Sequence, residues 1–305
     1  MTLRPASLIT IAVATIASGQ DLVHKAPPQT ETIFIVGATV HPVSAPPIED
    51  GVIGFENGRI TWVGPRTSFE GEMNGRLVRA DGMHVYPGLI GANTRMGLTE
   101  ISSVRASEDS DETGSITPEV RASVAVNPDS TLIPVTRANG ILTVATLPSG
   151  GTIPGQASVI AMDGWTWEDM TILDDAGMVV NWPRMRGGYA PFDEPREVKN
   201  PLDEITTFFD EADAYLAHAR GTDLRYESMR SVLEGEAPLM VRADDLEQIT
   251  SAVHFCNERD LRLVILGGHD AYMCADLLKA HDVGVIVDGT YQFPHRDDAP
   301  YDEAY

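Results

Sequence analysis

The feature that most constrains the fold is a regular alternation of apolar runs and amphipathic helical patterns in the last third of the chain. The apolar runs APLMVRA, LRLVILGG and VGVIVDG are separated by helical patterns and recur about every 22 residues. One helical pattern, residues 244–260, has apolar side chains at Leu246, Ile249, Val253 and Cys256, which is the spacing of one helix face. Repeated strand–helix–strand units with right-handed crossovers predict a parallel sheet, either open or closed into a barrel.

Residues 30–87 follow a different pattern and predict a small β subdomain. The runs TIFIVGATV and GVIGFENGRITWVG have the composition of short strands, and Asn57-Gly58 is a strong signal for a hairpin turn. No helix of useful length fits before Pro87. The sequence therefore predicts two parts, a β subdomain over residues 30–87 and a strand–helix part over residues 88–305.

Residues 1–19 have the organisation of a secretory signal peptide. Arg4 and the amino terminus supply positive charge, residues 7–17 form an apolar run, and small residues precede a cleavage position after Gly19. The apolar run is too short to cross a bilayer stably, and an uncleaved N-terminal helix is the alternative. We therefore expect an exported protein, periplasmic or extracellular, with no membrane attachment after cleavage.

Composition limits the partners of the chain. The 305 residues include 45 acidic and 22 basic side chains, for a net charge of −23. This charge argues against nucleic acid or an anionic membrane surface as a partner. The cysteines, Cys256 and Cys274, lack the spacing of metal ligands, and two buried thiols are favoured over a disulfide.

The stretch VYPGLIGANTRMGL, residues 85–98, reads as a buried strand that ends in a polar turn. Together with GVIGFENGRITWVGP before it and NPDSTLIPVTRANGILTVATLPSGGTIPGQ after it, this stretch resembles the amidohydrolase superfamily, particularly its imidazolonepropionase-like branch. The resemblance implies an α/β fold with a small N-terminal β-sandwich part and a (β/α)8 TIM-like barrel. Because residues 88–305 provide only six or seven candidate barrel strands, we expect an incomplete barrel.

The resemblance also implies metal-dependent hydrolysis of C–N bonds, in which zinc activates a water molecule and a carboxylate accepts its proton. The first barrel strand of the family usually carries His-x-His, two imidazoles that bind one ion. This chain has Asn93-Thr94-Arg95 there, and Gly91 replaces the usual aspartate. Asparagine is a weak neutral ligand, and arginine is a permanent cation without a lone pair to give. Zinc is therefore expected from the family, but its ligands at this strand are missing.

The other ligand positions implied by the resemblance are also altered. Arg242 stands where one histidine is expected, and Gly267 where another is expected. No lysine for carbamylation occurs in residues 26–198, and the late aspartate would fall beyond Tyr305. His269 follows a strand and opens a helix, so it is either a substrate contact or relocated ligand, or a helix-start histidine with a local hydrogen bond; the local role is favoured.

Three further patterns allow more than one interpretation. Residues 147–156, LPSGGTIPGQ, are either an anion-binding loop or a plain strand-to-helix connection. The acidic run over residues 107–114 is interpreted as a solvated loop rather than a calcium site. Trp165 and Trp167 are predicted on one face of a strand, where core packing is preferred to a ligand platform.

Three functional hypotheses follow. We favour a non-catalytic relative whose barrel mouth binds a small molecule through Asn93, Arg95, Arg242 and His269, without a metal and without an assigned catalytic residue. Two guanidiniums there would attract an anionic carboxylate or phosphate. The alternative is an active hydrolase of cyclic amides or peptides with non-standard metal ligands. The third is half of a larger protein or assembly, because a barrel without its last strand exposes edges that favour pairing, including pairing into a homo-oligomer.

Overall fold

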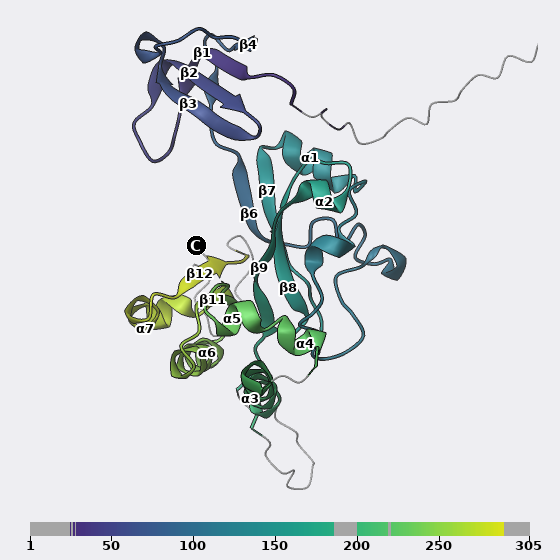
Figure 1. The fold of residues 1–305 in the computed structure, drawn as a ribbon. Helices are drawn as coiled ribbons and strands as arrows, with labels where there is room; N and C mark the ends of the chain where they lie inside the picture. The colour runs from purple at the N-terminus through teal and green to yellow at the C-terminus, as the bar shows by residue number, and fades with distance from the viewer. Residues whose placement is uncertain (1–24, 26, 28, 186–199, 219–220, 290–305) are drawn as a thin grey trace, which may run out of the picture.

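A computed structural model gives the fold of the chain in two sheets (Figure 1). The predicted signal peptide, residues 1–19, lies outside the part of the chain that the structure describes. None of the helices in the described part has both the length and the apolar character needed to cross a bilayer. The described residues are 25, 27, 29–185, 200–218 and 221–289.

The first sheet has five strands and contains the predicted hairpin. Asn57 and Gly58 connect β2 to β3 with positive φ angles of 51° and 72°, as a tight hairpin turn requires. β1 is central, and every second residue along it is buried, including Phe34 and Val36. The described residues form one sheet here, so the expected sandwich stays a prediction. The strands are β1 (Ile33–Val40), β2 (Ile48–Glu56), β3 (Arg59–Pro65), β4 (Arg76–Arg79) and β5 (His84–Val85).

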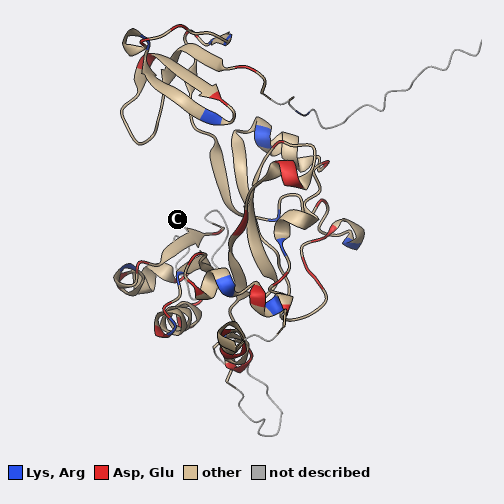
Figure 2. Cartoon of the chain, in the orientation of Figure 1, with Lys and Arg blue, Asp and Glu red and all other residues tan. Residues whose placement is uncertain are grey.

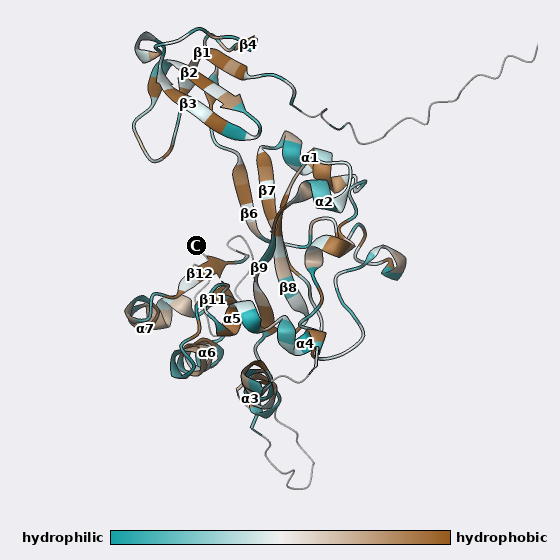
Figure 3. Ribbon diagram, viewed as in Figure 1, coloured by the Kyte–Doolittle hydropathy of each residue, from teal (hydrophilic) through white to brown (hydrophobic). Residues whose placement is uncertain are grey.

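The second sheet has seven strands, which follow one another in sequence order across the sheet. Its strands are mainly hydrophobic, whereas the helices carry both hydrophobic and hydrophilic residues (Figure 3). Acidic side chains are spread over helices and loops, with few on the strands (Figure 2). The strands are β6 (Leu89–Thr94), β7 (Ile141–Thr146), β8 (Gly155–Ala161), β9 (Thr171–Asn181), β10 (Leu239–Ala243), β11 (Leu263–Gly267) and β12 (Gly284–Val287).

This sheet is mixed, which corrects the expectation of a wholly parallel sheet. β6 is parallel to β7, and β9 to β12 are parallel to one another. β8, however, runs antiparallel to both of its neighbours. The physical reason is the length of the connections: residues 147–154 and 162–170 are too few for a crossover to a parallel strand, so the chain reverses direction twice.

Helix α6 shows how the amphipathic pattern builds the core. Ile249, Val253 and Cys256 are buried, and Leu246 packs against the same core as a partly buried residue. That core is shared with helix α3 and strands β9 to β11, and burying an Ile or Val side chain contributes roughly 1.5–3 kcal/mol. The helical segments are α1 (Leu132–Ala138), α2 (Trp167–Met170), α3 (Asp203–His218), α4 (Leu224–Glu227), α5 (Arg230–Leu233), α6 (Leu246–Glu258) and α7 (Ala275–Ala280), with 3-10 turns η1 (Arg66–Ser68), η2 (Arg105–Ser107), η3 (Ala122–Ala125) and η4 (Ala271–Cys274).

The two cysteines are buried free thiols, which confirms the favoured interpretation. Cys256 lies on α6, and Cys274 ends the η4 turn. Burial raises the pKa of the Cys256 thiol to about 12, because the thiolate would lose its hydration. Both side chains therefore act as small apolar residues of the core.

Candidate functional site

The candidate site lies where the parallel strands of the larger sheet end. Asn93 is on β6 and Arg95 follows that strand, whereas Arg242 is on β10 and Asp288 follows β12. In register, Arg242 is opposite Asn181 of β9. The carboxyl ends of parallel strands meet at one edge of a sheet, and this edge is where barrel enzymes bind ligands. We call this edge, with Asn93, Arg95, Arg242, Asp244 and Asp288, the barrel mouth.

A side-chain hydrogen bond joins the first and last strands at the barrel mouth. Asn93 Nδ2 donates to Asp288 Oδ2 at 2.5 Å. The backbone N–H of Asp288 also donates to the carbonyl of Gly267 at 3.3 Å, which ties this residue to the end of β11. Since β6 and β12 are the outer strands of the described sheet, this contact brings the two edges of a nearly closed barrel together.

Asp288 is a site residue that the sequence reasoning missed. It follows the apolar run GVIV directly, at the carboxyl end of a strand whose residues are half-buried or exposed. A polar residue at such a position is the signal that would have identified it.

The pKa of Arg242 is influenced by burial and by the charges of neighbouring residues at the mouth. Its side chain is half-buried, and burial lowers the pKa of the guanidinium from its ordinary value. The negative charge of Asp288 raises this pKa, the positive charge of Arg95 lowers it, and Asp244 raises it. An arginine side chain remains charged under these influences. The positive charge of Arg95 thus acts on the guanidinium of Arg242 at the mouth, where the resemblance implied both arginines.

The guanidinium of Arg242 also has a donor without an acceptor. Its Nε is buried and has no hydrogen-bond partner among the described residues. Within the same described ranges, neither Arg242 nor Arg95 has a carboxylate partner within the 4.0 Å of an ion pair. A buried N–H without a partner costs about 1–3 kcal/mol, so this group favours an acceptor supplied from outside.

Gly267 shows why the second implied histidine position is not a ligand position here. Its φ angle is +94°, which side chains rarely adopt, and a Cβ built there would collide with Oδ1 of Asp244. The space beside Gly267 is therefore occupied by a carboxylate from the end of the neighbouring strand.

His269 lies at the same edge, in the turn that follows β11, and is half-buried. The next residue, Asp270, is 2% exposed, and its Oδ2 accepts the backbone N–H of Leu246 at 3.1 Å. This bond satisfies a free N–H at the start of α6. A ligand contact by His269 stays a prediction.

The glycine-rich loop borders the mouth, but it does not lead to a helix. Residues 147–154 connect β7 to β8, so the plain strand-to-helix alternative is wrong. The carbonyls of Gly150 and Gly151 accept hydrogen bonds from Asn181 Nδ2 at 3.0 and 2.8 Å. This pair of bonds fixes the loop against the end of β9, and anion binding by its amides stays a prediction.

The tryptophan prediction is wrong in its local structure. Trp165 is 56% exposed in a loop, and Trp167 begins α2, so the two do not share a strand face. The chain turns between them because Thr166 caps α2, its Oγ1 accepting the N–H of Asp169 at 3.2 Å. Trp167 does pack against a buried cluster, as core packing requires.

The acidic run over residues 107–114 is mostly at the surface, with Ser110 buried. Asp111 forms an exposed ion pair with Arg105 at 3.2 Å. These contacts are those of a surface loop, in line with the interpretation favoured from the sequence.

The residues at the mouth do not fit the zinc site of the amidohydrolases. Positions 93, 95, 242 and 267 supply an amide, two guanidiniums and a glycine, of which the guanidiniums repel a dication. Across the part of the chain that the structure describes, no group of three or more His, Cys, Asp or Glu side chains is placed to hold a metal ion. Asp288 accepts a hydrogen bond from Asn93, and its negative charge acts on Arg242.

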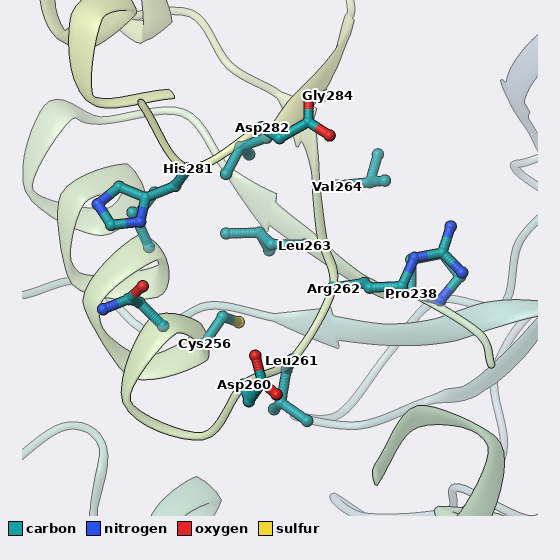
Figure 4. A pocket seen from close by; sticks show the side chains of 13 residues that line it. Pro238, Cys256, Asp260, Leu261, Arg262, Leu263, Val264, His281, Asp282 and Gly284 are labelled. Atoms are coloured by element: carbon teal, nitrogen blue, oxygen red, sulfur yellow. The ribbon is translucent and has the colours of Figure 1, made fainter. Parts of the chain in front are cut away.

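A separate pocket of about 340 Å³ lies at the other end of the strands (Figure 4). Leu263 and Gly284, the first residues of β11 and β12, line it together with Cys256 and His281. This is the amino-terminal end of the strands, which in barrel folds contributes to stability rather than to ligand binding. We therefore do not assign the candidate site to this pocket.

Comparison with known proteins defines the class of fold. No protein-family model matches the chain, and no curated protein matches its sequence. Among solved structures, an amidohydrolase from Thermotoga maritima matches with a TM-score of 0.75 and 24% identity, over 87% of this chain and 72% of that chain. The chain therefore has an amidohydrolase-type fold, which confirms at the level of the fold the resemblance seen in residues 85–98 and in the stretches before and after them. The imidazolonepropionase-like branch stays a prediction.

Two other solved structures match more distantly. A triazine hydrolase from Arthobacter aurescens has 17% identity and a TM-score of 0.36, over 85% of this chain and 62% of that chain. An adenosine deaminase from Xanthomonas campestris with bound zinc has 14% identity and a TM-score of 0.36, over 84% of this chain and 62% of that chain. At these TM-scores neither structure carries an argument about this chain.

Proposed function

We propose that the chain is a relative of the metal-dependent amidohydrolases whose barrel mouth binds a small anionic molecule in place of catalytic zinc. The observation that supports this proposal is the pair of guanidiniums, Arg95 and Arg242, at the strand ends where the family holds its metal. A carboxylate or phosphate bound between them would relieve their mutual repulsion. It would also supply an acceptor for Nε of Arg242, which has none among the described residues.

The test compares the wild type with the Arg95→Ala/Arg242→Ala double variant in thermal-shift titrations with acetate, phosphate and sulfate. Wild type is expected to gain stability with at least one anion, and the double variant is expected to lose that gain. Arg59→Ala/Arg76→Ala is the matched control, because both residues are exposed on the small sheet. Equal shifts for wild type and the Arg95/Arg242 variant would contradict the proposal.

The competing function is an active hydrolase of cyclic amides or peptides with non-standard ligands, which the shared amidohydrolase fold supports. Metal analysis by mass spectrometry, on protein purified without chelators, separates the two. About one zinc or more per chain, lost together with activity in the Asp244→Asn/Asp288→Asn variant, would favour the hydrolase.

Export remains part of the proposal, and it rests on the sequence of residues 1–19. Expression of the full chain in a bacterial host should yield a periplasmic or secreted product that begins at Gln20. A product that keeps Met1 in the cytosol would contradict export.

A further inference from the structure

The barrel mouth holds acidic as well as basic side chains, and its formal charge is balanced. Arg95 and Arg242 contribute two positive charges, and Asp244 and Asp288 contribute two negative charges. The rest of the chain is strongly acidic, with a net charge of −23. A balanced cluster at a strand edge therefore differs from the acidic surroundings of the whole chain.

The contacts between strands place these four charges around one opening. Asp288 is bonded to Asn93, two residues before Arg95. Asp288 is also bonded through its backbone to Gly267, beside which the carboxylate of Asp244 lies. Arg242 lies on β10, and Asp244 follows the end of that strand, two residues further along the chain. The four charges thus lie on or directly after three strands, β6, β10 and β12, and the backbone contact between Asp288 and Gly267 links them through the end of β11.

The opposite charges are near one another without being paired. Asp288 and Asp244 both influence Arg242 electrostatically, yet neither comes within the 4.0 Å of an ion pair among the described residues. Each carboxylate and each guanidinium consequently keeps capacity to bind another group. Charges that were already in contact would have little left to offer a ligand.

This arrangement constrains the ligand beyond its being an anion. A simple anion bound to the arginines would be repelled by two nearby carboxylates, and a simple cation would be repelled by the arginines. A molecule that carries both a carboxylate and an ammonium group avoids both penalties. We propose that the mouth binds a small zwitterion, with its carboxylate on Arg95 and Arg242 and its ammonium on Asp244 and Asp288. This inference rests on the proposed anion site and names the class of its ligand.

The test uses a series of unbranched ω-amino acids, from glycine to 6-aminohexanoate, in calorimetric titrations with the full chain. Each is compared with its N-acetyl derivative, which lacks the cation, and with its amide, which lacks the anion. One chain length should bind at least about tenfold more tightly than both derivatives, because only it meets both charge pairs at their spacing.

The Asp244→Asn/Asp288→Asn variant makes the test sharper, because the two ligand types should respond in opposite directions. Binding of the zwitterion should weaken about tenfold, whereas binding of the N-acetyl derivative should strengthen several-fold once the repelling carboxylates are gone. Each single variant is measured as well, since Asp288 also accepts the bond from Asn93. Asp282→Asn is the matched control, because Asp282 precedes β12 at the opposite end of the strands.

The outcomes separate this inference from the proposed function. If the N-acetyl derivatives bind as well as the amino acids, and the Asp variants strengthen both, the zwitterion inference is wrong and the anion site stands. If no probe binds and the Arg95→Ala/Arg242→Ala variant behaves like wild type, both are wrong. A tenfold preference for the zwitterion that is lost in the Asp variants supports both.

Discussion

The amide of Asn93 donates to the carboxylate of Asp288 across 195 positions of sequence, so side chains join the outer strands of the larger sheet. The two strands are not neighbours in the described sheet, whose order runs from β12 to β6. This contact therefore contributes to holding the curled sheet nearly closed at the barrel mouth.

Replacing Asn93 by aspartate should open this contact. In Asn93→Asp two carboxylates would face each other, and the free energy of unfolding at pH 7 should fall by about 1–2 kcal/mol. The loss should shrink below about pH 4, where carboxylates become protonated and the repulsion ends. Urea unfolding at both pH values measures the effect.

Asn74→Asp is the control for that experiment. Asn74 donates to Glu72 at 3.3 Å, a local and exposed contact that closes no sheet. Its replacement should change stability little, and equal losses for the two variants would show that the Asn93 contact does not hold the sheet edges.

The close approach of Asp244 to Gly267 predicts an energetic coupling between these positions. Gly267→Ala should cost about 2–3 kcal/mol, because the new methyl group meets Asp244 and the positive φ is unfavourable for alanine. In the Asp244→Ala background the clash disappears, and about 1 kcal/mol of backbone strain should remain. A double-mutant cycle by chemical denaturation gives the coupling, and purely additive losses would refute the contact.

The buried face of α6 should be sensitive to truncation and its exposed face should not. Ile249 is 0% exposed, so Ile249→Ala should lower the free energy of unfolding by about 2–5 kcal/mol. His254 is exposed on the same helix, and His254→Ala should stay within about 0.5 kcal/mol of wild type. A similar loss in both variants would mean that the face assignment of α6 is wrong.

The cysteines should be unreactive in the folded protein. At pH 8 the Cys256 thiol, with its pKa raised to about 12, is protonated and shielded, so a thiol reagent should label neither cysteine until urea is added. Because the folded-state pKa lies above the unfolded value near 9, this group favours folding fully below pH 9 and loses that contribution as pH rises toward 12. Rapid labelling of native protein at pH 8 would contradict this burial.

Local patterns were sufficient to predict the elements whose side chains face one core. The period of Ile249, Val253 and Cys256 predicted α6, and Asn57-Gly58 predicted the hairpin between β2 and β3. Arg95 and Arg242 were expected at the mouth because the resemblance to the amidohydrolases aligned them with metal-ligand positions, and the structure puts both at the carboxyl ends of strands.

The remaining features depend on contacts between distant segments. The direction of β8 is set by pairing with β7 and β9, and an apolar run has the same composition in either direction. Asp288 follows an apolar run, but its bond to Asn93, which joins two segments far apart in the sequence, is outside any local pattern. The turn between Trp165 and Trp167 was missed because the cap by Thr166 was read as a strand position.

The reversed strand β8 also changes what surrounds the opening. Its first residue, Gly155, rather than its last, lies on the side of the glycine-rich loop, so β8 contributes no strand-terminal side chain there, and the loop carbonyls of Gly150 and Gly151 accept bonds from Asn181 of β9. Variation in this sector would therefore act through the length and conformation of residues 147–154. Elsewhere around the opening, a single substitution at a strand end can exchange one charged group for another.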